Sequence, residues 1–263
     1  MALRLYANSV SPFVRKVRIA LYEKALDFEA VEIDSGARRA ELLAINPRGE
    51  VPALLDGDAI VTGSAAICDY IEHKFPQPPL LPPAPAPRAR CRWLESIADT
   101  HTDVLQFLLF LLAVRRPELC REYPAALPRL SDAVHRQHAF LNHELIDRDY
   151  LVGAFSLADV AFVPHLTSLA HLGEPVPDTR PHLRAWLARM LVRPSVERDA
   201  AQALAAYEAS AACSDPFFRS DRIHWRGDRV EAAIRLGLGP WLLAEVEAGR
   251  AYFSASPGEP ADR

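Results

Sequence analysis

The chain has 263 residues, of which 50% are hydrophobic and 24% are charged, a composition typical of soluble globular proteins. This length is sufficient for one large core or for two domains. A net charge of -4 provides no basic field for nucleic acid or for an anionic membrane, so neither is expected as a partner.

The first 76 residues alternate between short apolar strands and amphipathic helices. Strands are predicted at residues 3–6, 28–33, 53–55 and 59–61, and helices at 12–24, 37–45 and 64–74. The last two strands flank Asp56-Gly57-Asp58, which is typical of a hairpin turn. The predicted order, βαβαββα, describes one α/β domain over residues 1–76.

Prolines crowd residues 77–87 and predict a stiff, extended linker rather than a packed element. The segment from residue 88 to 212 then shows repeated helical periodicity, so an all-helical second domain is expected. Its predicted helices are 88–113, 123–146, 157–172, 182–192 and 196–206. Ser156 and Asp159 have the spacing of a capping box at the start of the third of these helices.

Residues 213–263 form a C-terminal extension with two possible short helices, 228–236 and 240–252. Gly237-Leu238-Gly239 separates them, and Pro240 suits a first helical position. The tail from Ser254 onward is expected to be frayed.

Neither the cysteines nor the apolar segments point to a metal site, export or a membrane. The cysteines are far apart, with no CxxC pair and no zinc spacing, and predict reduced, mostly buried thiols and no metal; they are Cys68, Cys91, Cys120 and Cys213. Arg4 occupies the place where a signal peptide needs its apolar centre. The most apolar segment, Val104 to Val114, is shorter than the ~20 residues that a bilayer requires. We therefore expect a buried helix there and a cytoplasmic protein.

Ser11 stands between the first strand and the first helix, directly before Pro12. The unpaired N–H groups and the positive dipole end of that helix favour an anion, so a thiolate held there would be stabilised. Two alternatives exist: the Ser11 hydroxyl caps the helix, or Ser9 is the donor instead.

Several motifs, taken in order, resemble the cytosolic glutathione transferase superfamily over roughly residues 1–206. Ser11-Pro12-Phe13 resembles the active-site segment of the tau class, and the register of the following helix places Ser11 where the zeta class keeps its catalytic serine. Asn46-Pro47-Arg48-Gly49 and Glu50-Val51-Pro52-Ala53-Leu54 resemble the family's turn before the third strand. Ser64 begins a segment like the family's third helix, and Ser156 to Asp159 match its folding box.

The resemblance implies a thioredoxin-like N-terminal domain, a helical C-terminal domain and a homodimer. It implies that a cis Pro52 lets the Val51 backbone pair with the cysteinyl part of glutathione, and that Ser64 holds the γ-glutamyl carboxylate, although a plain helix cap is the alternative for Ser64. Two positions depart from the family. Gly63 replaces an acidic residue that helps to hold the ammonium group, and Glu50 replaces a Lys or Gln, with Arg48 or Lys16 expected to compensate for its charge.

A pocket for the second substrate is expected between Ser11 and the first long helix of the helical domain. Aromatic residues and one histidine are its candidate lining, although aromatics at helical spacing also occur in cores; they are Tyr6, Phe13, His101, Phe107 and Phe110. Trp225 and Trp241 are expected either to close over this pocket or to cover the helical domain.

The predicted function is conjugation of reduced glutathione to a small hydrophobic electrophile, in detoxification, with the Ser11 hydroxyl stabilising the thiolate. One alternative is another glutathione-dependent reaction on the same scaffold, such as that of an isomerase, an etherase or a dehalogenase. The other is a non-catalytic binding or interaction protein, which the Gly63 and Glu50 departures and the extension favour.

Overall fold

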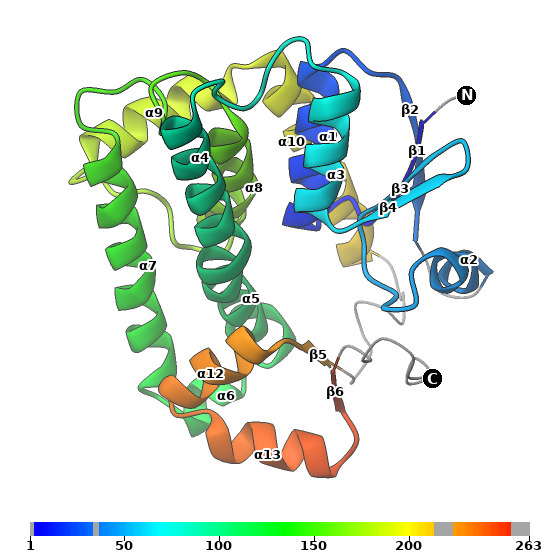
Figure 1. Cartoon of the computed structure of the whole chain (residues 1–263). Coiled ribbons are helices and arrows are strands. Elements are labelled where there is room, and N and C mark those ends of the chain that lie inside the picture. The colour runs from blue at the N-terminus through cyan, green and yellow to red at the C-terminus, as the bar shows by residue number, and fades with distance from the viewer. Residues whose placement is uncertain (1–2, 34–36, 213–222, 254–263) are drawn as a thin grey trace. The chain divides into compact units, whose positions relative to one another are not determined.

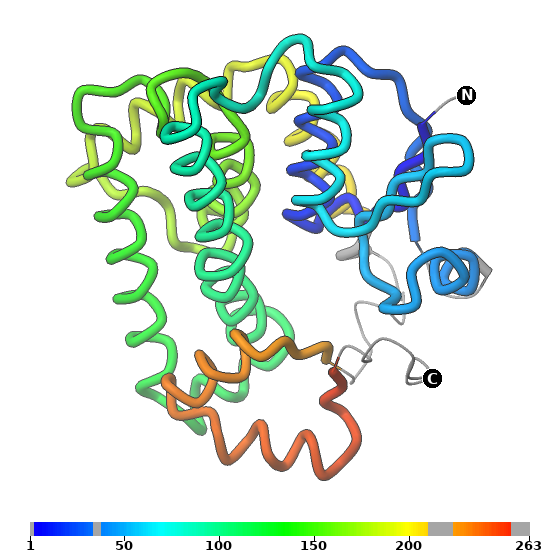
Figure 2. The backbone as a smooth tube through the Cα atoms, in the orientation of Figure 1, coloured from blue at the N-terminus to red at the C-terminus, as the bar shows by residue number. Residues whose placement is uncertain are grey.

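The computed structural model describes residues 3–33, 37–212 and 223–253, and they divide into two compact units. The first unit holds the described residues of 3–83 and 190–212, and the second holds 84–189 and 223–253. Figures 1 and 2 trace the chain through both units. The domain boundaries expected after residues 76, 87 and 212 stay a prediction.

The first unit is built on a four-stranded mixed sheet with the order β2-β1-β3-β4. Its strands are β1 (Leu3–Ala7), β2 (Phe28–Glu32), β3 (Ala53–Asp56) and β4 (Ala59–Thr62). Strand β1 is parallel to β2 and antiparallel to β3, which is antiparallel to β4. Each strand lies within one residue of its predicted bounds, and the thioredoxin-like fold of this unit is confirmed.

Four helices surround this sheet: α1 (Pro12–Glu23), α2 (Ala37–Ile45), α3 (Ser64–Lys74) and α10 (Pro194–Ala212). Helix α1 packs against both α3 and α10. Figure 1 shows α1 and α3 on one side of the sheet and α2 on the other. On the α2 side, Tyr6 and Ala53 pair across the strands and pack with Val31 and Leu42. The side chains of Leu5 and Leu54 alternate to the opposite face and are fully buried.

The end of α3 is joined to the proline-rich segment by a buried carboxylate. Glu72 accepts hydrogen bonds from the backbone N–H groups of Leu80 (3.0 Å) and Leu81 (3.1 Å) and pairs with Lys24 Nζ at 2.7 Å. Leu80 and Leu81 are themselves buried. The expectation of an unpacked linker was therefore wrong here, because these two leucines contribute to the core and their backbone is anchored.

The second unit is helical up to residue 189. Its helices are α4 (Pro85–Ile97), α5 (Asp103–Phe110), α6 (Leu119–Glu122), α7 (Ala126–Glu144), α8 (Leu157–His171) and α9 (Pro181–Leu191), of which the last two residues of α9 fall in the first unit. Helix α4 begins inside the predicted linker, because Pro85 suits the first position of a helix. The short helix α6 was not predicted.

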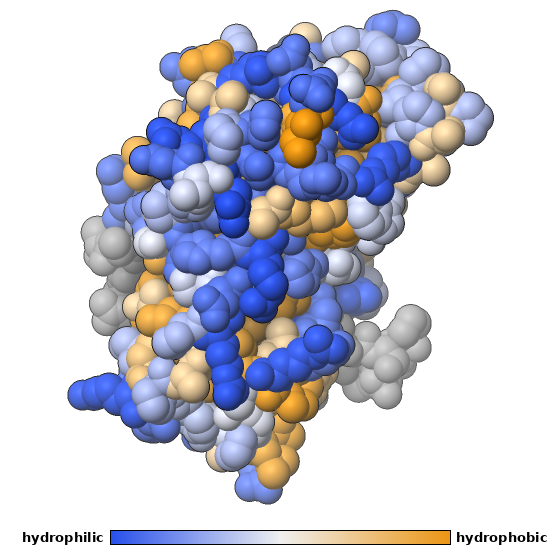
Figure 3. All heavy atoms as spheres, turned by 90° about the vertical axis from the view of Figure 1, so that its left-hand side faces the viewer, coloured by the Kyte–Doolittle hydropathy of each residue, from blue (hydrophilic) through white to orange (hydrophobic). Residues whose placement is uncertain are grey.

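The predicted helix 88–113 is a continuous helical run from Pro85 to Arg115. Two π-helical segments, Ala98–Thr102 and Leu111–Arg115, flank α5 within it. By length and composition alone this run could cross a membrane, so the shortness of the apolar segment 104–114 does not exclude a span. Half of the most apolar stretch of this run is buried, as in a core helix. Figure 3 shows one face of the molecule, and that face is predominantly hydrophilic with separate apolar patches.

The capping box at the start of α8 is present. Asp159 Oδ2 accepts from the backbone N–H of Ser156 (3.0 Å), and Oδ1 accepts from the N–H of Leu151 (3.0 Å) and from Trp186 Nε1 (2.8 Å). The buried Asp159 therefore ties the loop before α8 to helix α9, which is more than a local cap.

Residues 223–253 of the extension add helices α12 (Gly227–Arg235) and α13 (Gly239–Glu247) to this unit, with a parallel sheet of β5 (Ile223–Trp225) and β6 (Ala251–Phe253). Helix α13 ends before the predicted residue 252, because Gly249 takes a positive φ of 69° and the chain then enters β6. The Trp225 ring meets Phe107 edge-on at 5.4 Å and Trp241 at 6.0 Å, so these tryptophans cover the helical unit. The tail expected to be frayed lies outside the described residues.

Candidate functional site

Three loops of the first unit meet at one edge of its sheet. Ala53, the first residue of β3, pairs with Tyr6 near the end of β1 and with Thr62 at the end of β4. The residues that follow β1 and β4 therefore lie at the same edge as those that precede β3. These are the loop 8–11, the pair 63–64 and the turn 49–52, and Figure 1 shows α1 and α3 rising from this edge.

Ser11 is the residue directly before α1, in an extended conformation. Its carbonyl accepts the N–H of Arg15 at 2.9 Å, which starts the helix. Its hydroxyl makes no capping bond, and within the described ranges it has no hydrogen-bond partner at all. The alternative that Ser11 serves as a side-chain cap is therefore wrong, and its hydroxyl can donate to a ligand.

Ser9, the rival donor, is already engaged. Its hydroxyl donates to the carboxylate of Glu32 and accepts a hydrogen bond from Arg18 Nη1 at 3.0 Å. Its backbone N–H also bonds Glu32, at 3.1 Å. A ligand would have to displace these partners before it could use the Ser9 hydroxyl.

The turn before β3 is held by Asn46, which is 5% exposed. Its Nδ2 donates to the carbonyl of Glu50 at 2.8 Å, and its Oδ1 accepts from the N–H of Arg48 at 3.2 Å. Gly49 has a φ of +63°, a conformation that favours glycine, and a Cβ there would lie 3.0 Å from Leu43 Cδ2, close enough that the leucine side chain would have to shift.

The Val51–Pro52 peptide bond is cis, as predicted. The carbonyl of Pro52 accepts the N–H of Gly63 at 3.2 Å, which joins the turn to the start of α3. Within the described part of the chain, no hydrogen-bond partner is found for the backbone groups of Val51. Its N–H and C=O can therefore pair with an extended peptide.

Ser64 is the first residue of α3 and is 7% exposed. Among the residues that the structure covers, its hydroxyl has no partner either. Gly63 precedes it with φ 86° and ψ 132°, a conformation that L side chains rarely adopt. An acidic side chain at position 63 would therefore require a different local backbone.

Glu50 at this edge is paired rather than isolated. Arg48 Nε lies 2.9 Å from Glu50 Oε2, and Arg48 Nη2 donates to Oε1 at 3.0 Å. Of the two cations expected to compensate for Glu50, Arg48 is in contact with it. Lys16 is instead buried within α1, at 1% exposure.

The five candidates for the second-substrate pocket are divided between the two units, and their joint role stays a prediction. In the first unit, Tyr6 is buried in the core and its hydroxyl donates to Glu41. Burial raises the pKa of this phenol. Phe13, on α1, is half-buried. In the second unit, Phe107 and Phe110 are half-buried on α5 and His101 lies in the preceding π-helical turn, with its pKa lowered first by burial and then by the charge of Arg136.

A buried ion cluster joins α1 to α10, and the sequence did not predict it. Asp199 on α10 is fully buried and accepts from Arg15 Nε at 2.8 Å and from Arg18 Nε at 2.7 Å. The available indication was that Arg15 and Arg18 lie among the apolar residues of the amphipathic helix α1, because an arginine that becomes buried requires an acidic partner. The sequence did not indicate which carboxylate that would be.

Metal-ligating side chains are not clustered in the described part of the chain: no group of three or more His, Cys, Asp or Glu residues there could hold a metal ion. Cys68 and Cys91 are buried free thiols and Cys120 is half-buried, as predicted. Cys213 lies outside the described residues.

The chain matches two family models, described as the N-terminal and C-terminal domains of glutathione S-transferase, over residues 5–79 and 100–194. It is 34% identical over 207 residues to glutathione S-transferase 3 of Zea mays, covering 76% of this chain and 93% of that protein. It is also 28% identical over 183 residues to a stringent starvation protein A homolog of Coxiella burnetii, covering 66% of this chain and 79% of that protein.

Two solved structures are similar. A glutathione S-transferase-I bound with lactoylglutathione aligns with a TM-score of 0.67 and 30% identity, over 77% of this chain and all of that one. FzlA from C. crescentus aligns with a TM-score of 0.69 and 27% identity, over 76% and 92% of the two chains. The matched proteins thus include both glutathione transferases and proteins with other names.

Proposed function

Because the chain belongs to the glutathione S-transferase family, we propose that it conjugates reduced glutathione to a small hydrophobic electrophile. The observation that carries this proposal is the edge at which the hydroxyls of Ser11 and Ser64 stand at the starts of two helices beside the cis Val51–Pro52 bond. Neither hydroxyl has a hydrogen-bond partner among the described residues. The relative bound to lactoylglutathione supports glutathione as the ligand class.

Glutathione offers groups that match this edge. The start of α3 presents unpaired N–H groups and the positive end of a helix dipole, which favour the γ-glutamyl carboxylate, and Ser64 adds an O–H donor. The N–H and C=O of Val51, which have no partner in the described part of the chain, suit the backbone of the cysteinyl residue. These contacts would direct the cysteinyl side chain toward the start of α1.

At the start of α1, Ser11 would stabilise the thiolate. A free thiol has a pKa near 8.5, so little is ionised at pH 7. A serine hydroxyl is too weak an acid to be the base, but it can donate a hydrogen bond to sulfur and so favour the charged form. Lowering the thiol pKa by one to two units needs roughly 1.4 to 3 kcal/mol, within the range of one charge-assisted hydrogen bond and a helix terminus.

The reaction then follows from the thiolate. The thiol proton passes to solvent, the sulfur lone pair forms a bond to the electrophilic carbon, and the displaced pair leaves with a leaving group or takes up a proton from water. No base beyond water is required. We further propose that the protein works in the cytoplasm as a homodimer.

A second candidate is a non-catalytic interaction protein. Two of the matched proteins, the stringent starvation protein A homolog and FzlA, share the fold but are not named as transferases, and these matches favour the second candidate. The Gly63 and Glu50 departures from the family pattern favour it too. Retention on immobilised glutathione separates the two candidates, since only the transferase requires a working glutathione site.

Calorimetric titration with reduced glutathione tests the site. We expect micromolar to low-millimolar binding that is weakened roughly tenfold by Ser64→Ala, the loss of one hydrogen bond to a charged group. Absence of binding at millimolar glutathione would overturn the transferase proposal and favour the interaction protein.

The role of Ser11 is tested by the ultraviolet absorbance of bound thiolate as a function of pH. Ser11→Ala should raise the thiol pKa by about one unit and reduce turnover, because the hydrogen bond to sulfur is lost. Ser9→Ala is the matched control, two residues away with its hydroxyl engaged by Glu32, and should leave this pKa unchanged. A shift in Ser9→Ala alone would reverse the assignment.

A further inference from the structure

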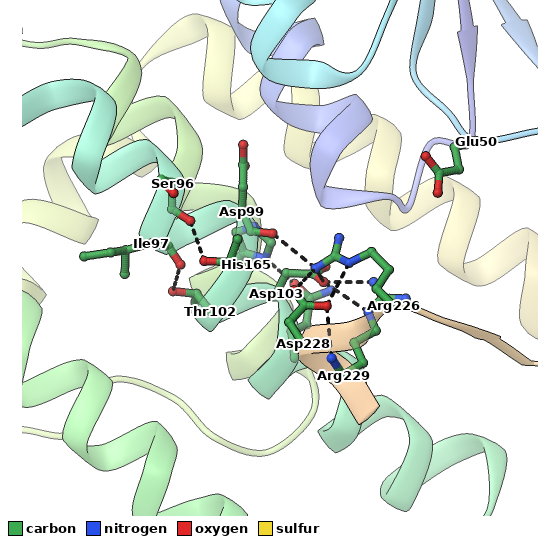
Figure 4. Close-up of polar contacts among 12 residues, drawn as sticks. Glu50, Ser96, Ile97, Asp99, Thr102, Asp103, His165, Arg226, Asp228 and Arg229 are labelled. Atoms are coloured by element: carbon green, nitrogen blue, oxygen red, sulfur yellow. Dashed lines mark hydrogen bonds and ion pairs between the residues drawn. The ribbon is translucent and has the colours of Figure 1, made fainter. Parts of the chain in front are cut away.

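Helix α12 of the extension is fixed to α5 by a buried charge network (Figure 4). Asp103 of α5 is 3% exposed and accepts hydrogen bonds from Arg226 Nη2 and from Arg229 Nη2, both at 2.8 Å. The Arg229 guanidinium also lies over the Phe107 ring, 4.0 Å from its centroid. Because a cation held by a buried carboxylate and by an aromatic face is well ordered, α12 has a fixed position on α5.

Helix α13 is held by this anchored segment and packs mainly on α12 and β6. Leu242 and Glu245 are its buried residues, and Glu245 is paired with Arg250. Residues 243, 244, 246 and 247 of the same helix are exposed. Figure 1 shows α13 on the side of α12 that is turned away from α5. The extension therefore presents one side of α13 as a fixed surface.

Three exposed aliphatic side chains lie in a row on this surface, and we call them the α13 patch: Ile234 is 57% exposed, Leu243 59% and Val246 41%. A Cβ at Gly239 would lie 3.8 Å from Ile234 Cγ1, so Ile234 lies beside the first turn of α13. Positions 239, 243 and 246 have the i, i+4, i+7 spacing that places residues on one face of a helix. The α13 patch thus runs along the helix from Ile234 to Val246.

Exposed apolar side chains are concentrated in this short part of the chain. Residues 223–253 hold four of the eleven large hydrophobic side chains that are exposed among the described residues. Single exposed apolar side chains are normal on a protein surface, but a group of them on one face is typical of an interaction site.

Opposite charges stand at the two ends of the α13 patch. Arg235 follows Ile234 at one end; its side chain is 78% exposed and pairs with Glu231. Glu247 follows Val246 at the other end, is exposed, and has no ion pair among the described residues. A surface that runs from a positive charge through aliphatic side chains to a negative charge is complementary to itself when it is reversed. The partner that matches this order is therefore a second copy of the chain.

We propose that the α13 patch binds the α13 patch of a second copy, with the two α13 helices antiparallel about a two-fold axis near Leu243. In this arrangement Val246 packs on the partner's Ile234 and Glu247 pairs with the partner's Arg235. Each of these contacts occurs twice, because a two-fold interface uses the same residues of both copies. The matched family regions end at residue 194, so this surface belongs to the extension, and its contact does not depend on glutathione.

The contact is small, so the association is weak. Helix α13 has nine residues. A helix of this length is about 13 Å long, too short to bury the ~800 Å² per partner of a standard interface. We expect a dissociation constant of roughly 10 to 100 µM for this contact.

Sedimentation velocity of the full chain from low to high micromolar concentration tests the aliphatic part of the contact. Leu243→Arg should weaken the concentration-dependent association at least about tenfold, because it buries a charge against its own counterpart. The mass that remains in this variant gives the number of chains held by any other contact. Leu204→Arg, at a leucine of α10 that is 51% exposed, is the matched control and should sediment like the unmodified chain. Identical association of the unmodified chain and Leu243→Arg would overturn the proposal.

Charge exchange tests the antiparallel pairing. Arg235→Glu places two carboxylates at each end of the interface, and Glu247→Arg places two guanidinium groups there, so each variant alone should associate several-fold more weakly. In a mixture of the two variants every facing pair has opposite charges, and association should return to within about twofold of the unmodified chain. Circular dichroism confirms that each variant folds. A mixture that associates no more tightly than either variant alone would overturn the proposal.

Discussion

Arg18 of α1 and Asp199 of α10 form a buried ion pair across 181 positions of sequence, with Arg18 Nε donating to Asp199 Oδ1 over 2.7 Å. Arg18 also donates to the hydroxyl of Ser9, which donates to Glu32. The same arginine thus joins α10 to the loop that carries Ser11. Removing its carboxylate would disturb both the packing of α1 and the engagement of Ser9.

Asp199→Asn should lower the free energy of unfolding by about 3 kcal/mol or more, because two buried guanidinium groups would lose the carboxylate that they share. The measurement is urea unfolding followed by circular dichroism. Glu197→Gln, an exposed carboxylate on the same helix, is the control and should change stability by less than about 0.5 kcal/mol. Equal unfolding midpoints for the two variants would contradict the structural importance of the pair.

The Ser11 edge could be predicted because local chemistry sets it. A serine before a proline begins a helix, and a glycine followed by serine begins another, so the sequence placed Ser11 and Ser64 correctly at two helix starts. The strand register then brings both starts to one edge. Resemblance was needed only for the cis Val51–Pro52 bond and for the ligand.

The charge clusters could not be predicted, because their partners are distant in sequence. Nothing local to Asp103 indicates Arg226, and nothing local to Arg15 indicates Asp199. Periodicity identified α12 as a helix but did not reveal which surface it packs against. The engagement of the Ser9 hydroxyl was likewise hidden, since its partners Glu32 and Arg18 lie 23 and 9 positions away in the sequence.

Asp103→Asn should release the extension. A neutral amide cannot neutralise Arg226 and Arg229, and an amide nitrogen facing either guanidinium would be repelled. Backbone amides of residues 227–247 should then exchange hydrogen at least tenfold faster, measured by mass spectrometry. Asp132→Asn, an exposed acid on α7, is the control; identical exchange in both variants would mean that the aromatic contacts alone hold α12.

Arg48 and Glu50 should be coupled in glutathione binding, if the proposed site is correct. Arg48→Gln removes the guanidinium that pairs with Glu50 and should weaken glutathione binding several-fold, because the Glu50 carboxylate then repels a ligand carboxylate more strongly. Glu50→Gln should bind at least as tightly as the unmodified chain, and the double variant should recover most of the loss. Additive effects in this double-mutant cycle would argue against coupling.

Asp159 should make the protein less stable as pH rises from about 4 to 6. Burial raises the pKa of this carboxyl to about 6, against the opposing effect of its hydrogen-bond donors. In this window the folded state binds a proton that the unfolded chain has released. The free energy of unfolding should therefore fall by about 3 kcal/mol as pH rises from the pKa of Asp159 in the unfolded chain to its pKa in the folded chain. Trp186→Phe removes one donor and should move this window upward, as measured by urea unfolding at a series of pH values.

His138 should act in the opposite direction. It is fully buried on α7, and burial, followed by the charges of His135 and Arg180, lowers its pKa to about 4. The unfolded chain, with a histidine pKa near 6.5, binds the proton first, so stability is lost as pH falls from about 6.5 to 4, by about 3 kcal/mol. Between pH 4 and 6 the effects of Asp159 and His138 on stability have opposite signs. Variants that change one residue at a time are therefore needed to measure each effect.

His138→Leu should remove the histidine's share of this dependence. Neither ring nitrogen has a hydrogen-bond partner among the described residues, so the substitution breaks no bond and should leave stability at pH 8 nearly unchanged. At pH 4.5 the variant should be more stable than the unmodified chain. His143→Leu, on the exposed part of the same helix, is the matched control; acid stability that rises equally in both variants would show that the buried ring of His138 is not the cause.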